Sequence, residues 1–559
     1  MRTFLFGGLL CALFCSLFSS ASQANEKSKL GVLIVFDQLR AEDVVTYAPY
    51  FPEGDFGGLM SRGAAHLDAH YQNATTTTAT GHATLSTGTG PQVHGIASNG
   101  WLDENGDFVY VAAQPGELFR DGKHERGYGA VGPRHLRAPT LGDAVKAATL
   151  GKGKVVSVSI KDRAAIFTAG KGADLVMWYR KDKGVFTTST AYPELPAWAV
   201  GPAFSLPKKG MQDGEWNILP TKVGAPKLPL DDVDGEHEEE GLSRTFPHHL
   251  KNVTDEKRAR QLYVATPQSM NDVFRLAELA VENMSLGADD QPDLLIVNIS
   301  TSDYVGHWFG PQSLEAVDLL RRADLRLRTF FRFLDDKVGK GQYALALSSD
   351  HGAPPLPERM QSAGLDAGRL NWHKLRTKLE KKLSTFPALP PTDDGKKRTR
   401  VAALVAPHLY VRLDDLNAKQ KQDARTILRR DILAHPGVAA LYDEEECQKS
   451  PITDGFQKLY CASIVPGRSG YFIIRPRPYW VFSSKDDTGI SHGSGYLYSR
   501  SVPLFLMGRR IRRGRVLQPV AVEDVAVTLA TMMGIPPPAA STGQVLDVFS
   551  ARWRLLPSR

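Results

Sequence analysis

The sequence predicts an α/β fold in which a mostly parallel sheet lies between helices, with cap segments inserted into this core. Three observations support this class. Short apolar runs bounded by polar or turn residues recur along the chain, and stretches with apolar residues at helical spacing separate them. Two regions without this rhythm interrupt the alternation. Strands that alternate with helices are typical of layered folds with a parallel sheet.

The predicted elements follow one another along the chain as strand, helix, strand. The apolar runs that indicate buried strands are Leu30–Phe36, Lys154–Ser159, Leu294–Asn298 and Tyr343–Ser348. The helical patterns between them are Leu141–Ala148, Ser269–Asn283 and Ser313–Asp336. Core-like sequence returns near the end, with an apolar run at Val502–Met507 and a helix at Val522–Met533.

These elements divide the chain after its leader into a core of three parts, residues 25–180, 269–354 and 481–559. Residues 181–268 are rich in Pro, Gly and charge, and residues 355–480 contain further helices and strands. Ligands of open α/β sheets bind at the carboxyl ends of the strands, so we expect both insertions to form walls there. We interpret the acidic run Asp231–Glu240 as a solvated loop, with calcium binding as the alternative.

The N-terminus has the features of a secretory signal peptide. Arg2 supplies a positive charge, the apolar run from Phe4 to Phe18 follows, and small residues lead to Ala24. We expect cleavage after Ala24, so that residues 1–24 are removed and the product is periplasmic or secreted. The apolar run is shorter than the roughly 20 residues that cross a bilayer, so no stable membrane anchor is expected after cleavage. A retained N-terminal anchor is the alternative.

The net charge bears on the class of substrate, and the cysteine content bears on disulfide formation. The formal net charge of +7 on 559 residues favours anionic substrates, but it does not indicate a nucleic-acid partner. Removal of the signal leaves two cysteines, Cys447 and Cys461. In an oxidising compartment such a pair predicts a disulfide rather than a metal site, and two free thiols are the alternative. The oligomeric state does not follow from the sequence.

Six candidate metal ligands lie directly after predicted strands or in short polar segments. They are Asp37, Asp303, His307, Asp350, His351 and His492. Asp303 and His307 are four residues apart and share a face if they lie on a helical turn. Carboxylate and imidazole ligands suit zinc, and three ligands per ion is the number found in catalytic zinc sites with an open position. Six unrelated helix-capping residues are the alternative.

The segment from Thr75 to Trp101 carries the most specific pattern of the chain. It reads Thr-x-x-Gly-His at Thr78–His82, then Pro-x-x-His-Gly-Ile at Pro91–Ile96 and Asn-x-Trp at Asn99–Trp101. This pattern resembles the nucleophile region of the alkaline phosphatase superfamily. It is similar to that of the bacterial, often phosphate-irrepressible, alkaline phosphatases with a threonine nucleophile. The resemblance extends over the six candidate ligands and spans residues 29–545, so it implies an alkaline phosphatase-like core.

The resemblance also implies roles for these residues. Thr78, three residues before the Gly-His pair, would be the nucleophile and form a phosphothreonine intermediate. Two zinc ions are implied. Asp37, Asp350 and His351 would hold the ion that also contacts and activates Thr78, and Asp303, His307 and His492 would hold the ion that stabilises the leaving-group oxygen. We expect His82 and His94 to be structural rather than ligands.

Lys161 and Arg163 favour phosphate monoesters over diesters. We interpret Ile160–Arg163 as a strand-like stretch that projects both cations to one face, with two surface charges as the alternative. In the monoesterase branch of the superfamily a matching Lys-x-Arg pair and an Asn contact the phosphate oxygens, which implies that Asn99, Lys161 and Arg163 bind the substrate. A dianionic monoester needs this charge, whereas a diester carries a second organic group there.

The sequence therefore predicts an exported, zinc-dependent alkaline phosphatase acting on small phosphate monoesters. The main alternative is a phosphodiesterase or nucleotide pyrophosphatase of the same superfamily. A sulfatase is disfavoured because a threonine stands at the position that would mature to formylglycine, and a mutase is disfavoured by export. An exported metal- or phosphate-binding protein without catalysis is a third alternative.

Overall fold

The computed structural model describes residues 27–120, 130–200, 214–221, 227–391, 395, 397–448, 452–483 and 488–550. The predicted signal peptide, residues 1–24, lies outside the described residues. Among the described helices, none combines the length and the apolar character that crossing a membrane requires.

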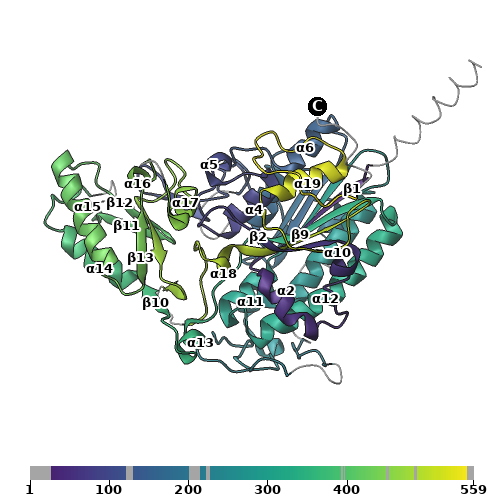
Figure 1. Ribbon diagram of the computed structural model, residues 1–559, viewed down its shortest axis with the longest axis horizontal. Coiled ribbons are helices and arrows are strands. Elements are labelled where there is room, and N and C mark those ends of the chain that lie inside the picture. The colour runs from purple at the N-terminus through teal and green to yellow at the C-terminus, as the bar shows by residue number, and fades with distance from the viewer. Residues whose placement is uncertain are drawn as a thin grey trace, which may run out of the picture.

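A ten-stranded sheet forms the centre of the molecule (Figure 1). Five neighbouring strands run parallel, in the order β9 (Tyr343–Ser349), β1 (Leu30–Phe36), β8 (Asp293–Ile299), β5 (Val155–Ser159) and β6 (Leu175–Arg180). Every residue of these five strands is buried. This explains their continuous apolar sequence, because a parallel strand is covered on both faces.

Antiparallel pairs flank the five parallel strands on both sides. On one side β16 (Ser501–Met507) runs antiparallel to both β9 and β2 (Ala64–His70), while β17 (Gly514–Val516) and β18 (Val520–Ala521) pair with β2. On the other side β7 (Val185–Thr187) pairs antiparallel with β6. Part of the predicted insertion 181–268 therefore extends the central sheet instead of covering its end.

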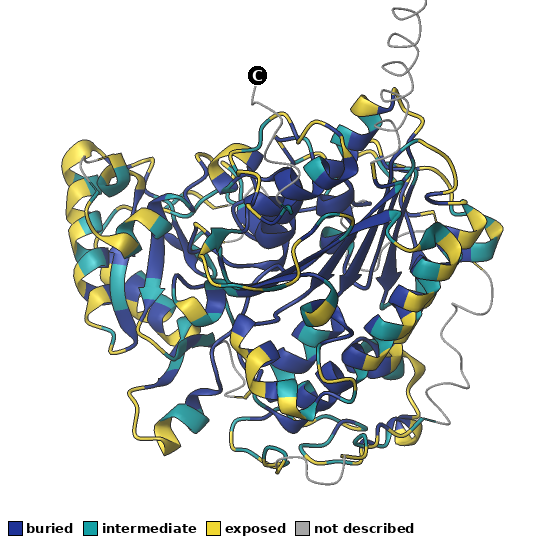
Figure 2. Ribbon diagram, turned by 45° about the vertical axis from the view of Figure 1, so that its right-hand side comes forward, coloured by how far each residue is buried: buried dark blue, intermediate teal, exposed yellow. Residues whose placement is uncertain are grey.

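Helices cover both faces of the sheet, and β1 shows how its residues divide between them. Val32 and Ile34 point into one hydrophobic cluster, whereas Leu33 and Val35 point into the other. The first cluster includes residues of α2 (Ala41–Tyr47), α10 (Pro267–Asn283), α11 (Thr301–Phe309) and α12 (Leu314–Leu334). The second includes residues of α4 (Thr78–Thr87), α6 (Leu141–Ala148), α7 (Asp162–Ala169) and α19 (Asp524–Met533). Figure 2 shows buried residues across the sheet and exposed ones on the outer sides of the helices.

A smaller lobe lies beside this core, on the left of Figure 1. It contains an antiparallel sheet in the order β11 (Val401–Val405), β12 (His408–Val411), β14 (Phe472–Pro476) and β13 (Val438–Tyr442). Helices α14 (Trp372–Leu383) and α15 (Ala418–Leu433) pack on this sheet and share a hydrophobic cluster with it. The chain enters and leaves the lobe through β10 (Gly368–Asn371) and β15 (Trp480–Ser483), which pair with each other. Cys447 and Cys461 form a disulfide, as predicted.

The remaining elements are short. They are α3 (Leu59–Arg62), α5 (Pro91–His94), β3 (Gly100–Leu102), β4 (Phe108–Tyr110), α9 (Glu256–Leu262), α13 (Pro357–Ser362), α16 (Glu444–Gln448), α17 (Gly455–Cys461) and α18 (Leu497–Arg500). Single 3-10 turns occur at Ala48–Tyr50, Ala197–Ala199, Leu250–Asn252 and Tyr263–Ala265, and a π-helical turn follows α12 at Asp335–Gly339.

The mixed α/β class and the order of the elements agree with the sequence prediction, while some bounds differ for local reasons. The helix predicted from Ser269 begins at Pro267, which fits a first turn because proline lacks only a hydrogen that would be unpaired there. The helix predicted from Ser313 begins at Leu314, because the Ser313 side chain accepts a hydrogen bond from Ala316 and caps the helix.

One interpretation of a polar segment was wrong, and a second holds only in part. Ile160–Arg163 is not strand-like, because β5 ends at Ser159 and α7 begins at Asp162, with Lys161 as its N-cap residue. The two cations are therefore placed by a helix start and not by strand alternation. The acidic run Asp231–Glu240 is not uniformly solvated, because Glu236 is only 3% exposed.

Candidate active site

The candidate site lies at the carboxyl ends of the parallel strands. Asp37 follows β1, Lys161 follows β5, Asp350 follows β9, and Asp303 lies in α11, which begins just after β8. Because parallel strands end at one edge of a sheet, residues far apart in sequence meet there. His492 reaches the same place from the chain that returns from the lobe towards β16.

Asp37, Asp350 and His351 form the first group of possible metal ligands. One ligand atom of each lies within 4.8 Å of the other two, and all three side chains are buried. Asp37 Oδ1, Asp350 Oδ2 and His351 Nε2 form no hydrogen bond of good geometry among the described residues, although Asp350 Oδ2 lies 3.3 Å from both His351 Nε2 and His82 Nδ1. Buried polar atoms without partners are costly, so three of them facing one point indicate a bound cation.

The electrostatics of this group fit a cation. Burial and the neighbouring charge of Asp37 raise the pKa of Asp350 well above its usual range. Burial also acts to raise the pKa of Asp37, but Lys161, a hydrogen bond with Asp350 and His82 together outweigh it, and the net direction is downward. A divalent cation between the two carboxylates would favour the charged form of both.

Asp303, His307 and His492 form the second group, and again their ligand atoms lie within 4.8 Å of one another. His307 Nε2 and His492 Nε2 lie 3.3 and 3.5 Å from Asp303 Oδ1. The Nδ1 atom of His307 is 2.7 Å from the Ile490 carbonyl, and that of His492 is 2.8 Å from the Thr76 carbonyl. A carbonyl at Nδ1 assigns the proton to that nitrogen and leaves Nε2 free, which is the arrangement of metal-binding histidines.

The two groups are neighbours. The rings of His351 and His492 stack with their centroids 3.7 Å apart. Six side chains from four separate segments therefore converge on two adjacent points. The structure brings together the two sets of three that the sequence analysis assigned to two ions.

Lys161 lies between the two groups and reaches the candidate nucleophile. Its Nζ is 2.9 Å from Asp37 Oδ2, forms an ion pair with Asp303, and donates to Thr78 Oγ1 at 3.3 Å. Burial acts to lower the pKa of Lys161, but Asp303 and Asp37 outweigh it and the net direction is upward. The ammonium therefore remains charged in alkaline solution.

Thr78 is the first residue of α4, and all ten residues of this helix are buried. The free N–H groups and the dipole of a helix N-terminus attract anions. Gly81 explains part of the sequence pattern, because a Cβ atom there would lie 2.0 Å from the Asp350 carbonyl oxygen. His82 Nδ1 lies 2.8 Å from the Thr78 carbonyl and 3.3 Å from Asp350 Oδ2. Gly81 and His82 thus pack α4 against the first ligand group.

His82 and His94 belong to neither ligand group. His94 Nε2 is 3.1 Å from Thr84 Oγ1, and its Nδ1 accepts from the Ile96 backbone at 3.1 Å. Burial lowers the pKa of His94 to about 3, so this ring is neutral and connects the Thr84 hydroxyl of α4 to the backbone of Ile96.

The lobe contacts the chain just before Thr78, the candidate nucleophile. Ser463 Oγ accepts hydrogen bonds from the backbone of Ala74 at 2.8 Å and of Thr75 at 3.1 Å. His408 Nε2 lies 3.2 Å from Thr75 Oγ1. Ser463, just after α17, and His408 of β12 therefore hold the segment that leads into Thr78.

Asn99 and Arg163 lie near the start of α4 and α7. Asn99 Oδ1 accepts a hydrogen bond from the Ala79 backbone at 3.0 Å, next to Thr78. Burial acts to lower the pKa of Arg163, but Tyr110 and Asp162 beside it outweigh burial and raise it. The Nε of Arg163 is buried and has no hydrogen-bond partner in the described part of the chain.

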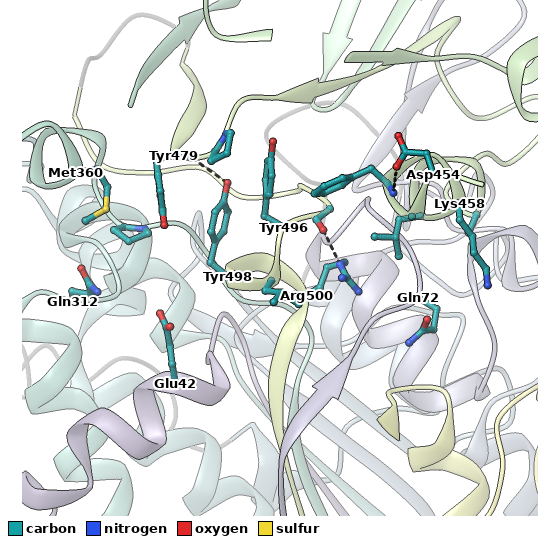
Figure 3. A pocket seen from close by; sticks show the side chains of 18 residues that line it. Glu42, Gln72, Gln312, Met360, Asp454, Lys458, Tyr479, Tyr496, Tyr498 and Arg500 are labelled. Atoms are coloured by element: carbon teal, nitrogen blue, oxygen red, sulfur yellow. Dashed lines mark hydrogen bonds between the residues drawn. The ribbon is translucent and has the colours of Figure 1, made fainter. Parts of the chain in front are cut away.

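Of two hollows between the core and the lobe, one adjoins the candidate site. One of about 450 Å³ borders His307 and is lined by Trp308, Trp372 and Phe482. The other, of about 1110 Å³, lies between the core and the lobe and contains none of the predicted site residues. Figure 3 shows the row of Tyr479, Tyr498 and Tyr496 along it. Only the smaller hollow adjoins the ligand groups.

Sequence reasoning missed Gln38, which contacts both ligand groups. Its position directly after Asp37 was the only available signal.

Known proteins resemble this chain over nearly its whole length. The family model of type I phosphodiesterases / nucleotide pyrophosphatases matches residues 31–496. Alkaline phosphatase PafA of Elizabethkingia meningoseptica is 30% identical over 96% of this chain and 97% of that protein. Alkaline phosphatase PhoV of Synechococcus elongatus is 28% identical over 96% of this chain and 98% of the PhoV chain.

The crystal structure of wild-type PafA matches with a TM-score of 0.84 at 29% identity, covering 94% of this chain and 99% of that one. A solved variant of PafA carries substitutions of one threonine, one asparagine, one lysine and one arginine. These four have the same spacing as Thr78, Asn99, Lys161 and Arg163 in this chain.

Proposed function

Because the chain belongs to the type I phosphodiesterase / nucleotide pyrophosphatase family of the alkaline phosphatase superfamily, we propose that it is a zinc-dependent alkaline phosphatase hydrolysing phosphate monoesters through a phosphothreonine. The position of Lys161 carries this proposal. Its buried ammonium contacts Thr78 and a carboxylate of each ligand group, so it lies where a phosphate dianion would bind. Export to the periplasm or medium is part of the proposal and rests on the N-terminal sequence.

The donor set fits two zinc ions. The unpartnered atoms of the first group and the Nε2 atoms of the second are the oxygen and imidazole ligands that zinc prefers. Asp37, Asp350 and His351 would hold one ion beside Thr78, and Asp303, His307 and His492 would hold the other. Zinc supplies Lewis acidity there, which lowers the pKa of a bound hydroxyl and stabilises charge on reacting oxygens.

Thr78, Lys161 and the N-terminus of α4 have separate roles in the proposed reaction. Thr78 Oγ attacks phosphorus, and its bond to phosphorus forms as the bond to the leaving oxygen breaks. Lys161 donates to Thr78 Oγ1, which favours the deprotonated form of this hydroxyl. The N-terminus of α4 attracts the phosphate. Water subsequently cleaves the phosphothreonine, releasing inorganic phosphate and regenerating Thr78.

Charge around the phosphate favours monoesters. Lys161 and Arg163 are two cations at the start of α7, and Asn99 adds an amide beside Thr78. A monoester dianion has three non-bridging oxygens for such groups, whereas a diester has two and a second organic substituent. The named alkaline phosphatases among the relatives support the same choice.

The decisive experiment combines Thr78→Ala with the matched control Thr78→Ser, and compares phenyl phosphate with bis-phenyl phosphate. We expect Thr78→Ala to fold and bind two zinc ions but to lose at least about a thousandfold in kcat, because the nucleophile is removed. Thr78→Ser should retain measurable turnover.

Undiminished turnover by Thr78→Ala would exclude Thr78 as the nucleophile. A strong preference of the wild type for bis-phenyl phosphate would replace the monoesterase by a diesterase. Mass spectrometry of the periplasmic protein tests export, because cleavage after Ala24 leaves Asn25 at the N-terminus.

A further inference from the structure

We infer that Gln38 is a positioning residue that ties one carboxylate of each ligand group together and so fixes the two metal sites relative to each other. The inference rests on the metal-binding part of the proposed function and not on its choice of substrate. Gln38 directly follows Asp37, and its side chain is 4% exposed.

The two N–H donors of Gln38 reach different groups. Its backbone N–H donates to Asp350 Oδ1 at 3.1 Å, and its side-chain Nε2 donates to Asp303 Oδ1 at 2.8 Å. Asp350 belongs to the first group and Asp303 to the second. Gln38 therefore connects a carboxylate of each group by hydrogen bonds, in addition to Lys161, which contacts Asp37 and Asp303.

Each bond selects a carboxylate oxygen. The bond to Asp350 uses Oδ1 and leaves Oδ2, which lies 3.3 Å from His351 Nε2. The bond to Asp303 holds Oδ1, the oxygen that faces both His307 and His492. Hydrogen bonds to ligating carboxylates orient them, and such partners contribute to metal affinity.

The backbone of Gln38 is shaped for this contact. Its φ of 64° lies in the left-handed region, which non-glycine residues adopt at a cost. This conformation turns the backbone N–H and the side chain of one residue to two different aspartates. The cost is consistent with a position selected for its contacts and not for local stability.

Gly306 supplies an independent observation. It lies within α11 between Asp303 and His307, where alanine would favour the helix by about 1 kcal/mol. A Cβ atom at 306 would lie only 1.8 Å from Gln38 Oε1. The absence of a side chain at this helical position therefore makes room for the Gln38 amide.

Gln38→Met tests the inference, because methionine keeps the unbranched shape and the backbone N–H but removes the amide donor. Zinc affinity is measured by competition with a chromophoric chelator, independently of activity. We expect one of the two zinc ions to bind about 10 to 100 times more weakly, since outer partners of metal ligands contribute that much. The other ion should bind as in the wild type. Excess zinc should restore kcat, and Gln268→Met at an exposed site is the matched control.

A double-mutant cycle distinguishes positioning from a general packing defect. Gly306→Ala should weaken the same zinc ion, because it displaces the Gln38 amide. Gln38→Ala removes the clashing oxygen, so Gly306→Ala added to it should cause no further loss. Should Gln38→Met fail to fold, Gly306→Ala with its cycle still decides the question.

Wild-type affinity for both ions in Gln38→Met would overturn the inference, as would independent, additive losses in the cycle. Equal weakening of both ions together with a lower Tm would assign Gln38 a purely structural role. A wild type that binds two zinc ions without hydrolysing phenyl phosphate would refute the proposed function and leave the role of Gln38 to be decided by the zinc titration.

Discussion

Replacement of Glu315 by glutamine should stabilise the folded protein, and by a larger amount as the pH rises. Glu315 is the second residue of α12 and is fully buried, and neither carboxyl oxygen has a hydrogen-bond partner among the described residues. The nearest basic group is His248, whose Nε2 lies 3.3 Å away and whose pKa burial lowers to about 4. Asp231 and Asp318 add negative charge, so the carboxylate has no cation to compensate it.

The size of the pH-dependent change in folding stability follows from the pKa of Glu315. Burial, with smaller effects from Asp231 and Asp318, raises the pKa of Glu315 from 4.5 to about 8. The raised pKa means that the folded protein retains the proton. The associated stability is present below pH 4.5 and is lost as the pH rises through about 8. At 1.36 kcal/mol per pKa unit, this loss between pH 5 and pH 9 is at most about 4 kcal/mol.

Neighbouring acids reduce the value expected for the single replacement. Burial and the charge of Glu315 raise the pKa of Glu236 to about 8, so the two groups share part of the effect. We expect Glu315→Gln to gain about 2 to 4 kcal/mol more at pH 9 than at pH 5, relative to the wild type at each pH. Glutamine has nearly the same shape and does not titrate.

Urea denaturation of both proteins at several pH values measures this difference. The zinc ligands are the same in both, so pH effects on metal binding cancel in the subtraction. Glu104→Gln, at an exposed position, is the matched control and should show no trend. A difference independent of pH would refute the titration of Glu315, and destabilisation by glutamine at high pH would show that the charged carboxylate binds a cation.

Three further changes test the site and the lobe. Lys161→Met should lower kcat/KM for phenyl phosphate at least about a hundredfold by removing a charge-assisted contact to phosphate, and an unchanged KM and kcat would contradict the role of Lys161. Gly81→Ala should weaken zinc binding in equilibrium dialysis, because its Cβ would lie 2.0 Å from the Asp350 carbonyl oxygen, and full zinc content would refute this packing argument. Cys461→Ser opens the loop to Cys447, 14 residues away, and should cost about 3 kcal/mol in urea denaturation. A loss below about 1 kcal/mol would show that the lobe does not depend on this constraint.

The fold class could be predicted because the parallel strands are buried on both faces. In Leu30–Phe36, successive residues point into different hydrophobic clusters on the two faces of the sheet. Polar residues are therefore absent from the whole strand, and the sequence shows where it begins and ends. Lys161 shows the limit of such reasoning. Alternation suggested a strand, but the chain turns into α7 at this residue, and a two-residue spacing does not distinguish the two. The division into core parts and insertions stays a prediction.

The site was predictable where chemistry is carried by residue type and not where it depends on contacts across the fold. Three aspartates and three histidines are residue types that bind metals, and their places after predicted strands made them candidate ligands. Glutamine at position 38 and serine at position 463 have no such signature. Gln38 contacts Asp303, 265 residues away along the chain, and Ser463 contacts Ala74, 389 residues away. Only the topology of the sheet and the docking of the lobe bring these pairs together.

The contacts of Ser463 and His408 with the segment before Thr78 bear on how this architecture can diversify. The lobe is connected to the core through two paired strands, β10 and β15, so its chain could be replaced as one continuous insertion. Its contacts with Ala74 and Thr75 oppose free exchange, because they couple lobe and nucleophile in one hydrogen-bonded unit. Recombination between relatives would therefore preserve a working nucleophile only when the lobe and the residues before Thr78 are inherited together.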